Sequence, residues 1–138
     1  MRVVVDTNIL VSSFFGGWPC KVIDLWKAGR ITICLSGPIV DEYVEVLRRM
    51  GLRDEVELKA LLALFARSPH CLFTANPPEV RMVDTDPDDD KFLACAAATG
   101  AQRVVSGDKA LLAVKSYLGI RVVTARELVE QFPADESP

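Results

Sequence analysis

The chain lacks the residue patterns of domains that are stabilised by a structural metal ion or by disulfide bonds. It has a single histidine, His70, and four cysteines that are widely scattered and form no Cys-x-x-Cys pair: Cys20, Cys34, Cys71 and Cys95. This spacing argues against a structural zinc site, which needs closely spaced pairs of ligands. Cys34 and Cys95 lie in apolar segments, where we expect small hydrophobic side chains whose thiols stay reduced.

The chain also lacks a long apolar run and an excess of positive charge. The opening run of residues 3–5 ends at Asp6, which is too short for the apolar region of a signal peptide. No segment reaches the ~20 apolar residues that span a bilayer, so we expect a cytoplasmic protein. The formal net charge is −3, from 16 Lys and Arg against 19 Asp and Glu residues. A uniformly basic nucleic-acid-binding surface is thereby disfavoured, whereas a local basic rim is not.

The length and composition indicate one domain. Half of the 138 residues are hydrophobic, which is enough for a sizeable core without a metal or disulfide. The chain contains no internal repeat, low-complexity segment or linker. We therefore expect residues 1–132 to form the domain and residues 133–138 to form a disordered tail.

Hydrophobic patterning predicts alternating strands and helices. Buried strands are expected over residues 2–5, 31–35, 103–106 and 120–123, and one or two short strands over residues 71–82. Helices are expected over residues 9–15, 19–28, 39–50, 54–67, 91–99 and 109–115, and after the capping box of Thr124 and Glu127. This order predicts an α/β fold of three layers, with a central parallel sheet of about five strands between helices.

Two acidic residues follow predicted strands. Asp6 directly follows the first strand, and Asp108 follows the strand over residues 103–106 after one glycine. Ligands of parallel sheets bind at the carboxyl ends of the strands, so both residues are candidates for a site there. Helix capping is the alternative, and for Asp108 it is an equally good explanation. For Asp6 it is weaker, because Thr7 and Asn8 offer other local caps.

A third candidate lies on the helix predicted over residues 39–50. Glu42 is at the edge of the apolar stripe of this helix, whereas Asp41 and Glu45 are on the opposite side. We therefore expect Glu42 to reach inward and the other two to face solvent. A glutamate at the edge of a stripe also often extends to water, so this second interpretation stays open.

The fourth candidate comes from the stretch Asp84–Asp90, which holds five carboxylates in seven residues. Capping and the helix macrodipole account for one or two of them, and Asp88 and Asp89 are the better capping candidates. Helical phase places Asp90 on the same face as Leu93 and its apolar neighbours. If Asp6, Glu42, Asp90 and Asp108 meet in one site, they repel one another without metal, which predicts a raised pKa for at least one of the four.

The residues around these acids resemble the PIN-domain nucleases, and more narrowly the PIN family of toxin components of bacterial and archaeal toxin–antitoxin pairs. The matching stretches are Val3–Leu10, Ser36–Leu47, Asp86–Ala96 and Val104–Asp108, and their order extends over about residues 1–132. The resemblance implies a PIN-like α/β/α domain that cleaves single-stranded RNA with the help of a divalent metal.

By the same resemblance, the acids of the family correspond to Asp6, Glu42, Asp90 and Asp108. The polar residue that supports the first acid corresponds to Asn8. Two positions differ from the family pattern: Ser106 stands where threonine is usual, and Leu111-Leu112 replaces an aromatic residue often found after the last acid. Oxygen ligands without imidazole or thiolate suit Mg²⁺ or Mn²⁺ rather than zinc.

The mechanism expected from these residues is metal-assisted hydrolysis. The four acids hold one or two ions that activate water for attack on phosphorus, and no side chain acts as the nucleophile. Lys91 and Lys109 each follow one of the acids and are candidate phosphate contacts, with an ordinary solvated lysine as the plainer alternative. Besides single-stranded RNA, an antitoxin protein and a second copy of the chain in a homodimer are the expected partners.

Two other functions are compatible with parts of the pattern. A phosphatase of the haloacid-dehalogenase type uses an aspartate nucleophile in an Asp-x-Asp motif, but Asn8 stands at the second acidic position here. A catalytically silent binding module of the same fold is the other alternative. The presence of all four acids argues against it, because a degenerate copy is expected to lose some of them.

Overall fold

The computed structural model describes residues 1–51, 55–75, 77, 81 and 87–133. The strands are β1 (Arg2–Val5), β2 (Thr32–Ser36), β3 (Cys71–Thr74), β4 (Arg103–Val105), β5 (Ser116–Tyr117) and β6 (Ile120–Val123). The helices are α1 (Thr7–Ser12), α2 (Gly17–Lys27), α3 (Gly37–Arg49), α4 (Glu55–Arg67), α5 (Asp90–Thr99), α6 (Lys109–Val114) and α7 (Ala125–Glu130). Two short 3-10 turns, η1 (Ser13–Phe15) and η2 (Pro87–Asp89), precede α2 and α5.

The strands form one sheet in the order β3-β2-β1-β4-β6-β5. Five neighbouring strands, β3, β2, β1, β4 and β6, are parallel, whereas the edge strand β5 pairs antiparallel with β6. The predicted α/β fold with a parallel sheet of about five strands is therefore confirmed. The prediction missed β5, because a two-residue strand next to a turn carries no periodic signal. Two residues around β5 have positive φ: Lys115, directly before the strand, at 63°, and Leu118, in the turn after it, at 50°.

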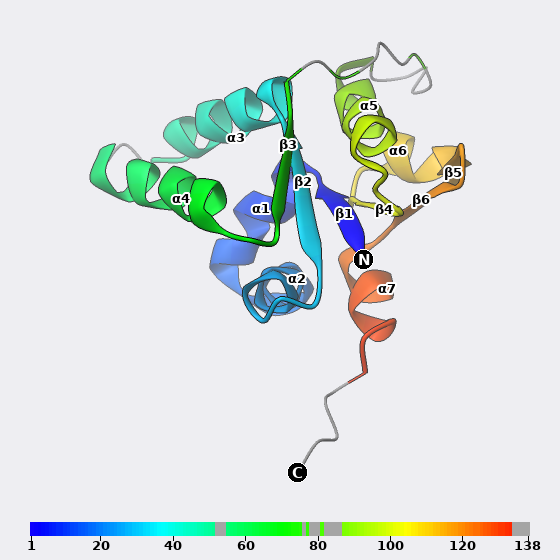
Figure 1. Ribbon diagram of the computed structural model, residues 1–138, viewed down its shortest axis with the longest axis horizontal. Coiled ribbons are helices and arrows are strands. Elements are labelled where there is room, and N and C mark those ends of the chain that lie inside the picture. Colours follow the sequence, from blue (N-terminus) through cyan, green and yellow to red (C-terminus); the bar gives the residue numbers. More distant parts are fainter. Residues whose placement is uncertain (52–54, 76, 78–80, 82–86, 134–138) are drawn as a thin grey trace.

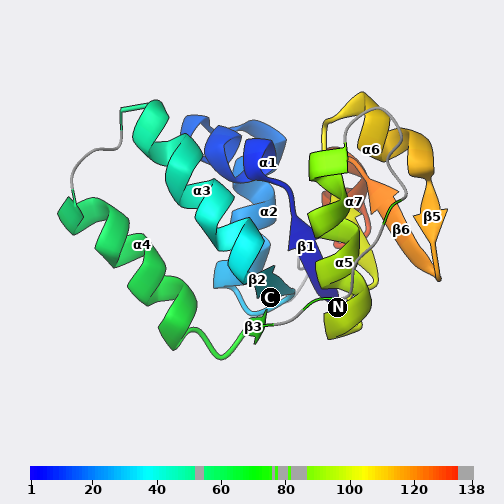
Figure 2. The ribbon, with the colours of Figure 1, turned by 90° about the horizontal axis from the view of Figure 1, so that it is seen from above.

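The central strand β1 is buried on both faces. Val3, Val4 and Val5 are at most 1% exposed, as expected for a strand covered by helices on either side. Figure 2 shows β1 running between α1 and α2 on one side and α5 on the other. The alanines of α5 let that helix contact β1, β2, β3 and β4.

Three helix starts show how local residues set the element boundaries. The capping box of Thr124 and Glu127 at α7 is present as predicted. Helix α3 begins at Gly37 rather than Ile39, because Ser36 is extended and Pro38 supplies a helical φ in the first turn. Helix α1 begins at Thr7 rather than Ile9, because the side chain of Asp6 caps it.

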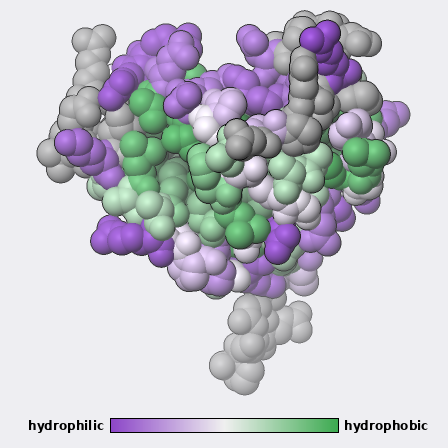
Figure 3. Space-filling view, turned by 45° about the horizontal axis from the view of Figure 1, so that its top comes forward, coloured by the Kyte–Doolittle hydropathy of each residue, from purple (hydrophilic) through white to green (hydrophobic). Residues whose placement is uncertain are grey.

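Some predictions fall outside the described residues. These are the start of α4 at Asp54, the positions of Asp84 and Asp86, and the tail over residues 134–138. In the described part of the chain, no helix is both long and apolar enough to cross a membrane. The four cysteines are all free thiols. On the face drawn in Figure 3, apolar residues extend over the left and middle of the surface and occur again at its right edge, with hydrophilic groups around them.

Candidate active site

Three of the four predicted site residues lie where a parallel strand ends or a helix begins, and the fourth, Glu42, lies one turn into a helix. Asp6 links β1 to α1, and Asp108 links β4 to α6. Glu42 is in the second turn of α3, and Asp90 is the first residue of α5. In Figure 1 the carboxyl ends of β1, β2 and β3 point toward the starts of α3 and α5. This edge of the sheet is where parallel α/β folds bind their ligands.

Three of these four residues share one pocket of about 210 Å³. The pocket, here called the acidic pocket, is lined by Asp6, Thr7, Asn8, Glu42, Val46, Asp88, Asp89, Phe92 and Asp108. The sequence positions of its carboxylates span more than 100 residues, so the tertiary fold brings them together.

Asp90 is not among the residues that line the acidic pocket. It is 8% exposed at the start of α5, and the preceding residues Asp88 and Asp89, in η2, line the pocket instead. The capping role predicted for Asp89 is wrong. Asp89 occupies the N-cap position, but its backbone is helical and its side chain makes no capping hydrogen bond. Capping side chains usually need an extended N-cap backbone.

Asp6 is held by two donors and is almost fully buried. Its Oδ1 accepts a hydrogen bond of 2.9 Å from the Ile9 amide, and its Oδ2 accepts one from the Ser106 hydroxyl. The pKa of Asp6 is raised, mainly by burial and to a smaller extent by the charge of Asp108, while its hydrogen bonds lower it. A raised pKa in the cluster was predicted, but desolvation rather than repulsion is its main cause. Asp6 itself, and not Thr7 or Asn8, caps α1.

Asp108 is both a helix cap and a pocket residue. Its Oδ1 accepts hydrogen bonds from the amides of Ala110 at 2.8 Å and Leu111 at 3.1 Å. The Asp108 amide donates to the Ser106 hydroxyl oxygen at 2.9 Å. Fully buried Ser106 therefore connects the first and last acids, since its hydroxyl donates to Asp6 and accepts from Asp108.

Glu42 points into the acidic pocket, whereas Asp41 and Glu45 are exposed as predicted. Its Oε2 accepts a hydrogen bond from the Thr7 hydroxyl, and its Oε1 accepts one of 2.8 Å from Lys91 Nζ. Each oxygen of the Glu42 carboxylate thus accepts a hydrogen bond from another part of the chain.

The sequence reasoning missed two residues that support the site. The Thr7 hydroxyl holds Glu42, and the buried Tyr43 hydroxyl donates to the carbonyl of Val5, directly before Asp6. Burial raises the pKa of Tyr43 well above its usual value, so this hydroxyl keeps its proton. Each of the two residues directly follows a predicted acid in the sequence. That adjacency was the available signal, but it does not say which way either side chain points.

A second, more open cavity of about 640 Å³ adjoins the acidic pocket. It is lined by Asn8, Ile9, Ser12, Gly107, Asp108, Lys109 and Ala110, and shares Asn8 and Asp108 with the acidic pocket. Lys109 is exposed along this cavity. The two cavities together offer a longer path than either does alone.

The donor set of the acidic pocket fits a hard divalent cation. Its carboxylates supply oxygen ligands, and burial disfavours the ionised form of Asp6 until a positive charge approaches. Among the described residues, no three such groups are close enough to hold an ion as they stand. Ligation therefore requires side chains to turn toward a common point.

Comparison with known proteins agrees with this geometry. A family model described as PIN domain matches residues 2–110. The chain therefore belongs to the PIN-domain family, whose members are usually nucleases and generally use divalent metals such as Mg²⁺. A comparison with curated proteins finds no match.

Proposed function

We propose that this PIN-domain protein is a Mg²⁺- or Mn²⁺-dependent endoribonuclease that hydrolyses single-stranded RNA, and that it is the toxin component of a toxin–antitoxin pair. The observation that carries the nuclease proposal is the acidic pocket. Asp6, Glu42 and Asp108 come from three separate elements and meet there at the carboxyl edge of the sheet.

In this proposal, Asp6, Glu42 and Asp108 would hold the metal from the acidic pocket, and Asp90, which does not line the pocket, would join them by turning its side chain toward it. A bound divalent cation supplies electrostatic stabilisation of phosphate oxygens and lowers the pKa of water. The chain itself positions the ligands: Ser106 orients Asp6 and the backbone of Asp108, and Thr7 orients Glu42. Asn8 supports the site from its position in both cavities.

The approach of RNA needs an explanation because the pocket is acidic. Two divalent ions would change the formal net charge from −3 to about +1, which eases the approach of a polyanion. The cavity next to the acidic pocket places Lys109 beside Asp108, where it is available for a backbone phosphate.

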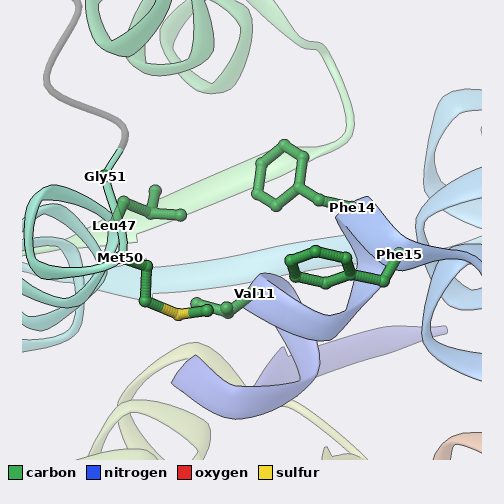
Figure 4. Close-up of a pocket in the computed structure, with 6 residues that line it drawn as sticks. All are labelled: Val11, Phe14, Phe15, Leu47, Met50 and Gly51. Atoms are coloured by element: carbon green, nitrogen blue, oxygen red, sulfur yellow. The ribbon is translucent and has the colours of Figure 1, made fainter.

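The partners of the chain are part of the proposal. We propose an antitoxin protein and a homodimer, in a cytoplasm that keeps the four free thiols reduced. Support for a protein partner comes from a separate pocket of about 300 Å³, lined by other residues than the two cavities described above and here called the apolar pocket. Figure 4 shows it lined by Val11, Phe14, Phe15, Leu47, Met50 and Gly51. Exposed apolar side chains around a pocket are a common feature of interaction sites.

The nuclease proposal is tested with purified protein and four labelled substrates: single-stranded RNA, duplex RNA, single-stranded DNA and a phosphomonoester. Wild type should cut single-stranded RNA with Mg²⁺ or Mn²⁺ and stop with EDTA. Asp6→Asn should lose cleavage while keeping the wild-type circular dichroism spectrum. The exposed Asp41→Asn is the matched control and should retain activity. Phosphomonoester hydrolysis with a trapped aspartyl phosphate would instead support the phosphatase.

The toxin role needs a separate experiment in cells. Induced wild-type protein should arrest growth and Asp6→Asn should not, and co-expression of a neighbouring antitoxin gene should restore growth. Normal growth with active wild-type protein would contradict the toxin role and leave the nuclease proposal intact.

A further inference from the structure

The ion pair between Lys91 and Glu42 differs from two surface ion pairs in the described part of the chain. Its Nζ–Oε1 distance is 2.8 Å, and the two side chains are only 23% and 26% exposed. The pairs Arg49–Glu45 and Arg126–Glu130 join neighbouring turns of one helix, with side chains more than half exposed. The Lys91–Glu42 pair instead links α5 to α3 across the edge of the acidic pocket.

The two oxygens of Glu42 have different kinds of partner. Oε2 is held by the hydroxyl of Thr7, a short buried side chain with little freedom to move. Oε1 is held by the ammonium of Lys91, at the end of a flexible four-carbon stem. The Lys91 partner can therefore leave without loss of the carboxylate orientation that Thr7 provides.

We propose that Lys91 is the resident counter-cation of Glu42: it neutralises this carboxylate in the metal-free protein, competes with a divalent cation for Oε1, and thereby tunes the metal affinity of the site. This inference rests on the proposed metal-dependent function. A divalent cation carries twice the charge of an ammonium and prefers carboxylate oxygen, so it displaces Lys91 at sufficient concentration. The released ammonium then stands beside the pocket, where it can contact a phosphate of the substrate.

Lys109 provides a matched control for this role. Each lysine directly follows a predicted acidic ligand, Asp90 or Asp108. Lys109 is exposed, however, and makes no ion pair within the described part of the chain. Removal of either positive charge strengthens cation binding slightly through the general field, but only Lys91 competes for Glu42.

The test measures Mn²⁺ dissociation constants by isothermal titration calorimetry. Lys91→Met should bind Mn²⁺ about tenfold more tightly than wild type, which is within the usual range of couplings between two ligands of one protein. Lys109→Met should stay within about twofold of wild type at physiological salt, where screening weakens the field of an exposed charge. In a Glu42→Gln background, Lys91→Met should bring only the small gain seen for Lys109→Met, because the two cations no longer share a carboxylate.

A second readout follows the lysine itself. Acetylation of Lys91, measured by mass spectrometry, should become faster when Mn²⁺ is added to wild type, because the ammonium leaves Glu42. Acetylation of Lys109 in the same sample corrects for changes in reagent or pH. This readout does not depend on catalytic activity or on any variant.

The outcomes separate this inference from the proposed function. One outcome would overturn only the role of Lys91. In it, Asp6→Asn abolishes Mn²⁺ binding, but Lys91→Met binds Mn²⁺ no more tightly than Lys109→Met does. Weaker binding by Lys91→Met would also overturn it, because the lysine would then help to build the site. Wild type that binds no Mn²⁺ and cuts no RNA would overturn the proposed function, and this inference with it.

Discussion

Helices α1 and α3 both contribute to two very different pockets. Thr7 of α1 and Glu42 of α3 line the acidic pocket, whereas Val11 of α1 and Leu47 of α3 line the apolar pocket. Residues four or five positions apart on each helix thus lie on different surfaces. The acidic pocket is organised by directional hydrogen bonds between buried polar groups, and the apolar pocket only by packing.

The comparison shows which properties each region can contribute. In the acidic pocket, every change of charge or donor alters the free energy of a neighbouring buried group, because unpaired polar atoms are costly there. In the apolar pocket, exposed aromatic side chains make few specific contacts, so their removal costs the monomer little. Catalysis and metal binding are expected at the first region, and protein association at the second.

The largest expected effect distinguishes two glutamates of α3. Glu42→Gln should lower RNA cleavage by about a hundredfold, which corresponds to ~2.7 kcal/mol of activation free energy, because the amide keeps the shape but loses the charge. Glu45→Gln, on the exposed side of the same helix, should stay within about twofold. Single-turnover cleavage assays at saturating Mn²⁺ measure both. Equal rates for the two variants would show that Glu42 has no part in the reaction.

The next effect concerns the buried hydroxyl that connects two acids. Ser106→Ala should lower the free energy of unfolding by about 1–3 kcal/mol, because it leaves Oδ2 of Asp6 without a donor and the Asp108 amide without an acceptor. Chemical denaturation checks this value. The exposed Ser116→Ala, in β5, should change stability by about 0.5 kcal/mol or less. A loss at Ser106 no larger than at Ser116 would contradict the proposed connection.

A smaller effect, with an unusual sign, is expected at Asp6 in metal-free protein. Because burial raises its pKa in the folded state, Asp6 favours folding below the unfolded pKa and loses that contribution as pH rises through the folded pKa. Asp6→Asn in EDTA should therefore melt above wild type at pH 7, with a difference that shrinks toward pH 4.

Thermal melts at both pH values test this sign, with the exposed Asp41→Asn as the control for general charge removal. Asparagine preserves the cap of α1, since it accepts the Ile9 amide as aspartate does. A lower melting temperature for Asp6→Asn at pH 7 would show that the lost bond from Ser106 outweighs the relief of desolvation.

The smallest effect on stability is expected in the apolar pocket. Phe15 is 78% exposed, so Phe15→Ala should change the free energy of unfolding by about 0.5 kcal/mol or less and leave RNA cleavage unchanged. It should, however, shift the proposed homodimer toward monomer in light scattering. Phe73→Ala, on β3 and 62% exposed, is the control and should leave the oligomeric state unchanged. Identical oligomeric states for both variants would remove the apolar pocket from the dimer contact.

Features set by neighbouring residues were predictable from the sequence. The run Val3–Val5 predicted a strand buried on both faces, and Thr124 with Glu127 predicted a helix start. The outward positions of Asp41 and Glu45 followed from helical phase. Each of these depends on periodicity or on bonds between residues a few positions apart.

Features set by distant residues were not predictable. The bond between Ser106 and Asp6 joins positions 100 residues apart, and the pair of Lys91 and Glu42 joins positions 49 apart. Asp88 and Asp89 line the pocket and Asp90 does not. This difference arises because Asp88 and Asp89 lie in the 3-10 turn η2, directly before α5.

The sequence by itself determined the α/β class, the parallel sheet, most element boundaries and the set of acids to consider, because these follow from local periodicity and capping. Only the tertiary structure decided which carboxylates share a pocket, that burial rather than repulsion raises the pKa of Asp6, and that Lys91 pairs with Glu42. These properties depend on where separate elements meet, and desolvation and Coulomb energies arise only once they have met.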